Sequence, residues 1–220
     1  MKLFFKLFIF LIFFFQPALS KEFFAEYQIK TKGIKIGHLV WKVQIIDDFY
    51  ETSIELTGKG VFSRIFSFDG QYGAAGKIQS KKLIPQKYSQ KWVTSKKKRN
   101  VELLFNGEKI SKIILDPAEK EFSRVRYNEL KNYMDPLTSF LNILLGSNTS
   151  NTVDGRRVYT MELGSGTNQN RILIKKYTNI WADHKRNDLE YIDIYKKKEG
   201  ILPSKINIKF KGNLFILNKI

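Results

Sequence analysis

The residue types that perform nucleophilic catalysis are sparse in this sequence and do not form a known constellation. The chain has no cysteine, and its two histidines are His38 and His184. A catalytic serine or threonine needs a base placed to take its proton, and the G-x-S-x-G turn of α/β-hydrolases is absent. His38 lies in an alternating strand pattern, where a hydrogen-bonded structural histidine is expected, and His184 lies in a polar loop. We therefore predict that the protein is not an enzyme and has no catalytic residue.

The sequence also predicts no metal site and no cofactor. Cysteine ligands are missing, and the two histidines are not four residues apart, as a helical zinc pair would be. Asp47-Asp48 is typical of a turn. The paired carboxylates of glycosidases come together in space and not in sequence. A hydrolase of an envelope polymer therefore stays open as the least favoured function.

Two adjacent arginines form the most distinctive polar motif, Asp154-Gly155-Arg156-Arg157. Guanidinium groups bind phosphate or carboxylate through two parallel hydrogen bonds, so Arg156 and Arg157 are candidates for contact with an anion. In the alternative interpretation, Asp154 and Gly155 shape a turn. The arginines then point to opposite faces of a strand and pair with acidic neighbours.

Two basic turns between strands supply further candidates for anion contact. They are Lys96–Arg99 and Lys196–Lys198, and the residues singled out in them are Lys97, Lys98, Arg99 and Lys197. If both turns lie at one rim of the fold, they make a patch for anionic headgroups. If they do not, they are solvated tips that protect strand edges from pairing.

One helix is predicted within a chain that otherwise alternates between apolar and polar residues. Asp135 suits the N-cap, Pro136 the first turn and Gly146 the stop. The apolar residues of this stretch recur at the spacing of one buried helical face: Leu137, Phe140, Leu141, Leu144 and Leu145. The fold class predicted is mainly β. It is a single curved antiparallel sheet or half-barrel of about ten strands, with the amphipathic helix packed in its concave face.

The N-terminus predicts export. Lys2 and Lys6 flank the start of an apolar run that reaches Phe15, and small residues precede an expected cleavage after Ser20. The run is shorter than the roughly 20 residues of a spanning helix, which favours a cleaved signal over an anchor. No later segment is apolar enough to span. Residues 21–220 are then one periplasmic domain.

The formal charge of +17 favours anionic partners such as lipid headgroups or envelope polymers. Nucleic acid is disfavoured by the export signal. The alternative is that a compositional bias produces the charge, because Lys, Asn, Ile and Phe are abundant together.

Four segments, in this order, resemble a family of exported bacterial proteins catalogued as domain of unknown function 3108. They are GIKIGHLVWKV at 33–43, YMDPLTSFLNIL at 133–144, VDGRRVYTMEL at 153–163 and YIDIYKKKEGILPSKINIKFKGNLFIL at 191–217. The family is similar in outline to the periplasmic lipoprotein carriers, whose curved sheet wraps a helix and holds acyl chains. That likeness concerns the fold and does not by itself give a function.

These observations together favour a non-catalytic protein that binds or carries an amphipathic anionic envelope ligand, a lipid or glycolipid. Its basic rim would bind the headgroup, and apolar side chains would line a cavity for the acyl part. The cavity candidates are Trp41, Phe62, Phe66, Trp92, Phe140, Leu141 and Leu144. A filled core uses the same residue types. The competing hypothesis is an interaction scaffold that docks a protein or a cell-wall polymer.

Overall fold

The computed structural model describes residues 20–58, 68–165, 170–182, 184–197 and 200–220. The predicted signal peptide, apart from Ser20, lies outside these residues, and so do the cavity candidates Phe62 and Phe66. In the described ranges no helix has both the length and the apolar character needed to cross a membrane.

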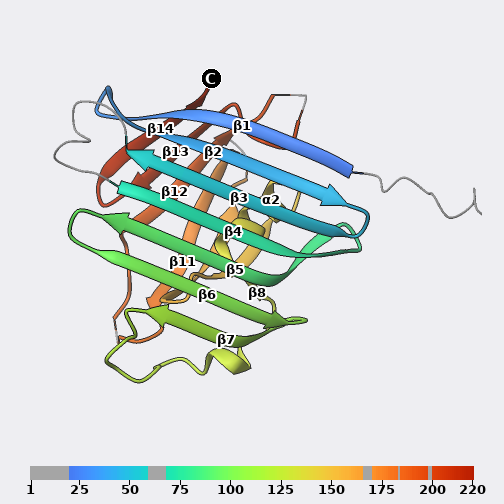
Figure 1. Ribbon diagram of the computed structural model, residues 1–220, viewed down its shortest axis with the longest axis vertical. Coiled ribbons are helices and arrows are strands. Elements are labelled where there is room, and N and C mark those ends of the chain that lie inside the picture. Colours follow the sequence, from blue (N-terminus) through green and yellow to red (C-terminus); the bar gives the residue numbers. More distant parts are fainter. Residues whose placement is uncertain (1–19, 59–67, 166–169, 183, 198–199) are drawn as a thin grey trace, which may run out of the picture.

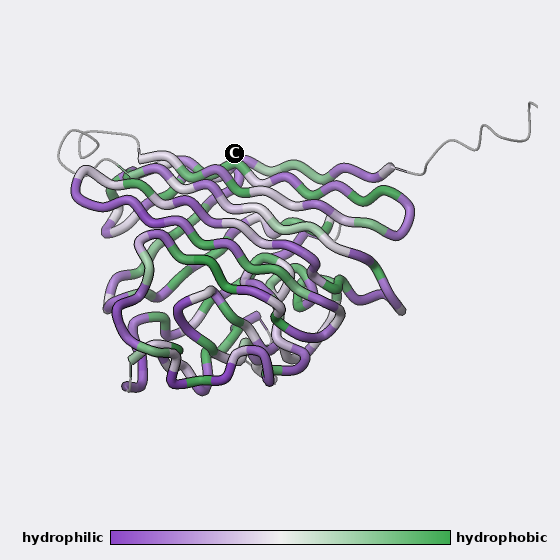
Figure 2. Tube along the Cα trace, turned by 60° about the horizontal axis from the view of Figure 1, so that its bottom comes forward, coloured by the Kyte–Doolittle hydropathy of each residue, from purple (hydrophilic) through white to green (hydrophobic). Residues whose placement is uncertain are grey.

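The described residues form one sheet of fourteen strands with a short α-helix and a single 3-10 turn. Their inner and outer faces follow the alternation of apolar and polar residues, which Figure 2 shows as repeated colour changes along the strands. The strands are β1 (Ser20–Thr31), β2 (Ile34–Ile46), β3 (Phe49–Gly58), β4 (Phe68–Gln79), β5 (Lys82–Thr94), β6 (Lys98–Asn106), β7 (Lys109–Asp116), β8 (Tyr133–Met134), β9 (Thr149–Val153), β10 (Arg157–Leu163), β11 (Arg171–Asn179), β12 (Leu189–Tyr195), β13 (Lys205–Phe210) and β14 (Asn213–Lys219).

The sheet curls into a nearly closed barrel. Strands β1 to β7 form an antiparallel meander, and β1 also pairs with β14, from which the order runs back to β8. Figure 1 shows β1–β7 as one wall, with helix α2 (Pro136–Leu144) and the C-terminal strands behind it. The segment between edge strands β7 and β8 crosses the remaining gap, where the Arg124 amide donates to the Ile180 carbonyl over 2.6 Å.

The mainly β class and the single short α-helix are confirmed, but two details of the predicted sheet are wrong. The described residues contain fourteen strands and not about ten, and β8 runs parallel to β9. Strand β9 lacks the apolar alternation of the other strands, because two of its core-facing residues, Ser150 and Thr152, are polar. Their hydroxyls donate to Ser139 of the helix over 3.0 and 2.9 Å, which makes their burial tolerable.

Helix α2 begins and ends as predicted, but its buried surface is wider than one apolar stripe. Leu141 and Leu144 are buried, Phe140 is half-buried and Leu145, at the C-cap, is 45 % exposed, which corrects the prediction for that residue. The helix contacts strands on several sides, β4, β5, β9 and β10. Its polar side chains Thr138, Ser139 and Asn142 are therefore buried as well.

Polar contacts fix both ends of the helix. The Asn142 amide group accepts a hydrogen bond from the Leu83 backbone N–H and donates one to the Leu83 carbonyl, both at 2.9 Å. Asp135 caps the helix by accepting from the backbone N–H groups of Leu137 and Thr138. The Thr138 hydroxyl donates to Asp135 over 2.5 Å and lies 2.6 Å from the hydroxyl of Tyr50 on β3.

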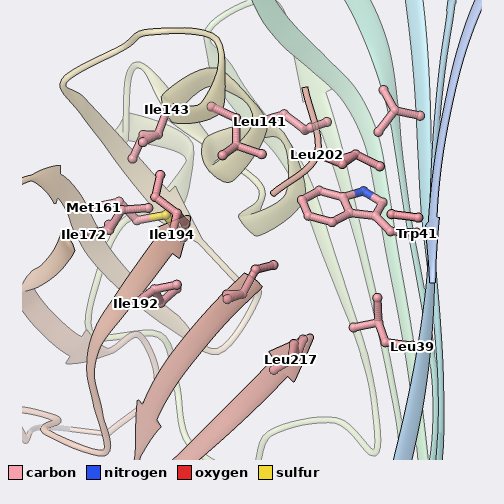
Figure 3. Close-up of a cluster of buried hydrophobic side chains, with 14 of the residues drawn as sticks. Leu39, Trp41, Leu141, Ile143, Met161, Ile172, Ile192, Ile194, Leu202 and Leu217 are labelled. Atoms are coloured by element: carbon pink, nitrogen blue, oxygen red, sulfur yellow. The ribbon is translucent and has the colours of Figure 1, made fainter. Parts of the chain in front are cut away.

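The interior contains two apolar clusters with the helix between them. In the first, Trp41 of β2 reaches toward Leu141 of the helix, and the opposite wall contributes Met161 and Ile192 (Figure 3). The second cluster joins the inner faces of β4–β7 to Leu137 and to residues of β9 and β10. The first turn of the helix therefore belongs to one cluster and its last turn to the other.

We predict that Asn142→Ala lowers the free energy of unfolding by about 2–4 kcal/mol, because the buried N–H and C=O of Leu83 both lose their partner. Urea unfolding of the purified protein measures this. Asn148→Ala, at an exposed position, is the matched control and should change stability by less than about 0.5 kcal/mol. Equal effects of the two substitutions would contradict the role of Asn142.

The stability of the protein should also depend on the ionisation of Asp135. Burial raises its pKa from 3.8 to about 6, although its hydrogen bonds to Thr138 and Leu137 oppose the shift. Between pH 3.8 and about pH 6, Asp135 is therefore protonated in the folded state and ionised in the unfolded state. The free energy of unfolding rises as the pH falls through this window. At about 1.4 kcal/mol per pKa unit, the wild type should gain about 2 kcal/mol relative to Asp135→Asn between pH 7 and pH 4. Urea unfolding of both proteins across this range tests the sign, and a constant difference would refute it.

Candidate functional site

A pocket of about 320 Å³ lies on the inner face of the barrel where the two apolar clusters meet, and it is open to solvent on one side. Inner-face residues of β2–β5 form one wall, because alternate side chains of these strands point inward. The first turn of α2 and the start of β10 form the other. The cavity is lined by Leu39, Ile54, Leu56, Tyr72, Tyr88, Gln90, Pro136, Leu137, Asp154 and Tyr159.

The cavity is apolar and nearly neutral. Burial raises the pKa values of Tyr72, Tyr88 and Tyr159, so these hydroxyls stay protonated at physiological pH. Asp154 is the one carboxylate in its lining. That carboxylate accepts from the backbone N–H groups of Arg156 and Arg157 over 2.9 and 2.7 Å, and from the Arg157 guanidinium over 3.1 Å. The lining therefore suits an alkyl chain better than a polar solute.

One end of the barrel carries most of the predicted anion-contact residues, and we call it the basic end. It contains the turn between β5 and β6 and the turn before β10. Lys97 and Arg156 lie in these turns, and Lys98 and Arg157 are the first residues of β6 and β10. Arg99 is exposed and lies opposite Trp92, its cross-strand partner. The turn before Arg156 packs against β6, because an added methyl group at Gly155 would lie 2.5 Å from Val101, two residues from Arg99. The pKa of Arg156 is lowered first by burial and then by the charge of Arg99.

The two arginines after Asp154 each pair with an acid. Arg157 forms an ion pair with Asp154. Burial lowers the pKa of Arg157, but the charge and the hydrogen bond of the Asp154 carboxylate outweigh burial, so the pKa is raised. Arg156 forms an ion pair with Glu119 and donates to the carbonyl of Pro117 over 3.0 Å. The interpretation in which Asp154 shapes the turn and the arginines contact acidic residues describes this geometry. The structure adds that Arg99 is their neighbour.

An aromatic pair lies on a row of glycines next to the cavity. The rings of Phe68 and Trp92 stack with centroids 5.6 Å apart and planes 13° apart. Trp92 covers Gly70, where an added methyl group would lie 3.0 Å from the indole, and Phe68 covers Gly58 at 3.2 Å. Because neither glycine has a side chain, the two rings can lie flat on the inner face of the sheet.

The predicted cavity residues divide into two groups. Trp41, Phe140, Leu141 and Leu144 do come together, but as packing of the first cluster, where Trp41 stacks on Phe140 at 5.7 Å. Trp92 lies apart from them at the basic end. Lys197 is at the opposite end from the other anion-contact candidates, because β12 ends there beside the start of β13. The two basic turns therefore do not share a rim.

None of the cavity candidates that the structure describes lines this cavity, and its actual lining was not predicted from the sequence. Leu39, Leu56 and Tyr72 are ordinary inward residues of alternating strands, and nothing in their spacing marks them. Their signal is the pairing register, which places Leu56 opposite both Leu39 and Gly70.

The histidines have surface contacts. Nε2 of His38 lies 3.3 Å from the Glu26 carboxylate on the neighbouring strand, and the exposed His184 contacts the Asn179 side chain. Across the ranges that the structure describes, no three His, Asp or Glu side chains are grouped closely enough to hold a metal ion.

We predict that Gly70→Ala displaces Trp92, because the new methyl group would also lie 2.9 Å from the ring of Tyr72. The strain should lower the free energy of unfolding by about 1–3 kcal/mol and shift tryptophan fluorescence. Gly73→Ala is the control on the same strand, where the nearest atom is Oγ of Ser89 at 3.3 Å. A normal indole environment in both variants would show that Trp92 does not lie on Gly70.

Comparison with known proteins identifies a fold and a family. A solved structure described as a beta-barrel-like protein of domain of unknown function DUF1849 from Brucella abortus superposes with a TM-score of 0.53. The similarity covers 92% of this chain and 97% of that one at 11% sequence identity, so it concerns the fold alone. No curated protein matches the sequence. The family described as protein of unknown function (DUF3108) matches residues 26–177, which is more than half of the chain, and the protein therefore belongs to this family.

Proposed function

We propose that this protein is an exported, non-catalytic binder or carrier of an amphipathic anionic ligand of the cell envelope, a lipid or glycolipid. The alkyl part occupies the interior cavity, and the anionic headgroup lies at the basic end. Delivery to the periplasm follows from the N-terminal signal, with cleavage after Ser20.

The interior cavity is the observation that carries this proposal. Its 320 Å³ is at the lower end of the roughly 300–1,000 Å³ typical of small-molecule sites. Such a volume suits a single alkyl segment and is small for a ligand with several acyl chains. Most of the wall consists of apolar side chains and neutral tyrosines, with Gln90 and the Asp154 carboxylate as the other polar members. An alkyl chain that leaves water for this site therefore gains by the apolar area it buries.

A second hollow at the same end supports an elongated ligand. It measures about 650 Å³ and has a largely apolar lining that includes Ile36, Phe68 and Phe215. Phe68 is also one ring of the aromatic pair beside Trp92. Apolar surface is thus present on both sides of the Phe68–Trp92 pair. The basic turns lie at the same end of the barrel.

The competing scaffold hypothesis is favoured by a different surface. A groove of about 690 Å³ runs over the outer face of β3–β7, above the paired small residues Ser53, Gly73 and Ser89. Its lining holds the carboxylates of Glu55, Glu102 and Asp116 against the single ammonium group of Lys91. Such a surface suits a hydroxyl-rich or cationic polymer and not an anion.

One experiment distinguishes the carrier hypothesis from the scaffold hypothesis. The mature protein, purified from periplasm without detergent, is examined by native mass spectrometry, and any bound molecule is extracted and identified. We expect a stoichiometric lipid with an anionic headgroup. An apo mass that stays unchanged after incubation with oleate would contradict the carrier function.

Leu56→Trp should abolish this binding, because the larger ring fills the cavity that Leu56 lines. The neighbouring substitution Thr57→Trp places the same ring on the outer face of β3 and should leave binding unchanged. We expect at least a tenfold weaker affinity for oleate in Leu56→Trp, measured by titration calorimetry. Equal loss in both variants would indicate a general structural effect, and loss in Thr57→Trp alone would favour the outer groove.

A further inference from the structure

Arg156 is held from two directions by the segment that follows β7. Its Nη1 forms an ion pair with Glu119, and its Nη2 donates to the Pro117 carbonyl over 3.0 Å. The Arg156 side chain is 14% exposed and that of Glu119 is 32% exposed. Glu119 thus brings a carboxylate to a largely buried guanidinium at the basic end.

The charges around this ion pair are not balanced. The guanidinium groups of Arg99, Arg156 and Arg157 share the site with the carboxylates of Glu119 and Asp154. Arg99 forms no ion pair with any residue that the structure describes. Burial and the charges of Arg99 and Arg157 lower the pKa of Arg156. A further anion would relieve this repulsion.

Hydrogen-bond donors also remain. The Nε atoms of Arg156 and Arg157 are buried and have no hydrogen-bond partner among the described atoms. A buried donor without a partner costs free energy that an added acceptor recovers. A small rearrangement of Arg156 would bring its planar fork of donors to an oxyanion, which it recognises through two parallel bonds.

The segment with Glu119 has few other attachments before residue 124. Glu121 pairs with Arg124 at 3.6 Å, but both side chains are more than half exposed, where such pairs add little stability. Phe122 is 94% exposed. The next firm contact is the backbone hydrogen bond from Arg124 to Ile180. Residues 117–123 therefore depend mainly on Arg156 for their position.

We propose that Arg156 binds the headgroup of the amphiphile and that the Glu119 carboxylate occupies this site when no ligand is bound. A carboxylate or phosphate on the ligand replaces the Glu119 carboxylate, and residues 117–123 are released when it does so. This inference rests on the proposed function, because the alkyl part of the same ligand occupies the cavity whose wall includes Asp154.

The test compares three ligands that share one oleoyl chain: oleate, oleoyl lysophosphatidic acid and neutral monoolein. Each is titrated below its critical micelle concentration against the wild type and Glu119→Gln. Removal of the competing charge should tighten binding of the two anionic ligands about tenfold and leave monoolein unchanged. The stronger of the two anionic ligands then identifies the headgroup as carboxylate or phosphate.

Glu121→Gln is the matched control, because it removes the same charge two residues away and should alter no affinity. In an Arg156→Gln background, Glu119→Gln should have no further effect, since the two residues act as one pair. Hydrogen exchange of residues 118–123 should quicken when oleate binds the wild type. It should already be fast in Glu119→Gln without ligand.

The outcomes separate the two proposals. In one outcome, all three ligands bind both proteins with equal affinity, without any change in the hydrogen exchange of residues 118–123. That result would overturn the replacement of Glu119 by the ligand at Arg156 and would leave the cavity function intact. Failure of all three ligands to bind either protein would overturn both.

Discussion

The structure depends on how a short helix is held inside a barrel by polar groups. Helix α2 is surrounded by strands, so it cannot keep a solvated polar face as a surface helix does. Asn142 meets this constraint by pairing with both backbone groups of Leu83, much as a neighbouring strand would. Asp135 does so at the other end by capping the first turn. The helix is thereby fixed in register with β5, and the positions of both apolar clusters follow.

The interior cavity is a consequence of that placement. The first turn of the helix packs with Leu137 against β4–β7, whereas its last turn packs against the opposite side of the barrel. Between the two clusters a space remains, lined by Leu56 and Tyr159 on the side of the first cluster and by Tyr88 and Leu137 on the side of the second. The interior thus has a packed part and a hollow part. The hollow part is near the end of the barrel where the arginines gather.

Much of this architecture was predictable from local patterns. The helix followed from its cap, its proline and the spacing of its leucines, and most strands followed from alternation. Strand β9 did not, because its inward residues Ser150 and Thr152 are made acceptable only by Ser139, a contact that no local pattern reveals. The prediction that Leu145 is buried failed for a related reason. The spacing of apolar residues on a helix does not show where the strands that cover the helix end.

The candidate site was less predictable than the fold. Aromatic residues such as Trp41 and Phe140 drew attention by their size, yet they fill the core. The cavity is lined by smaller residues that only strand register brings together. The motif at Arg156 and Arg157 was visible in the sequence, but Glu119 is 37 residues away and became its partner through the crossing of the gap between β7 and β8.

The measurement that most directly tests the account is methyl NMR of the protein with a spin-labelled fatty acid, 16-doxyl stearate. An alkyl chain in the cavity predicts broadening of the methyl signals of Leu39, Leu56 and Leu137, while Ile114 in the outer groove stays sharp. Broadening confined to Ile114, or equal weak broadening over the whole surface, would contradict the account.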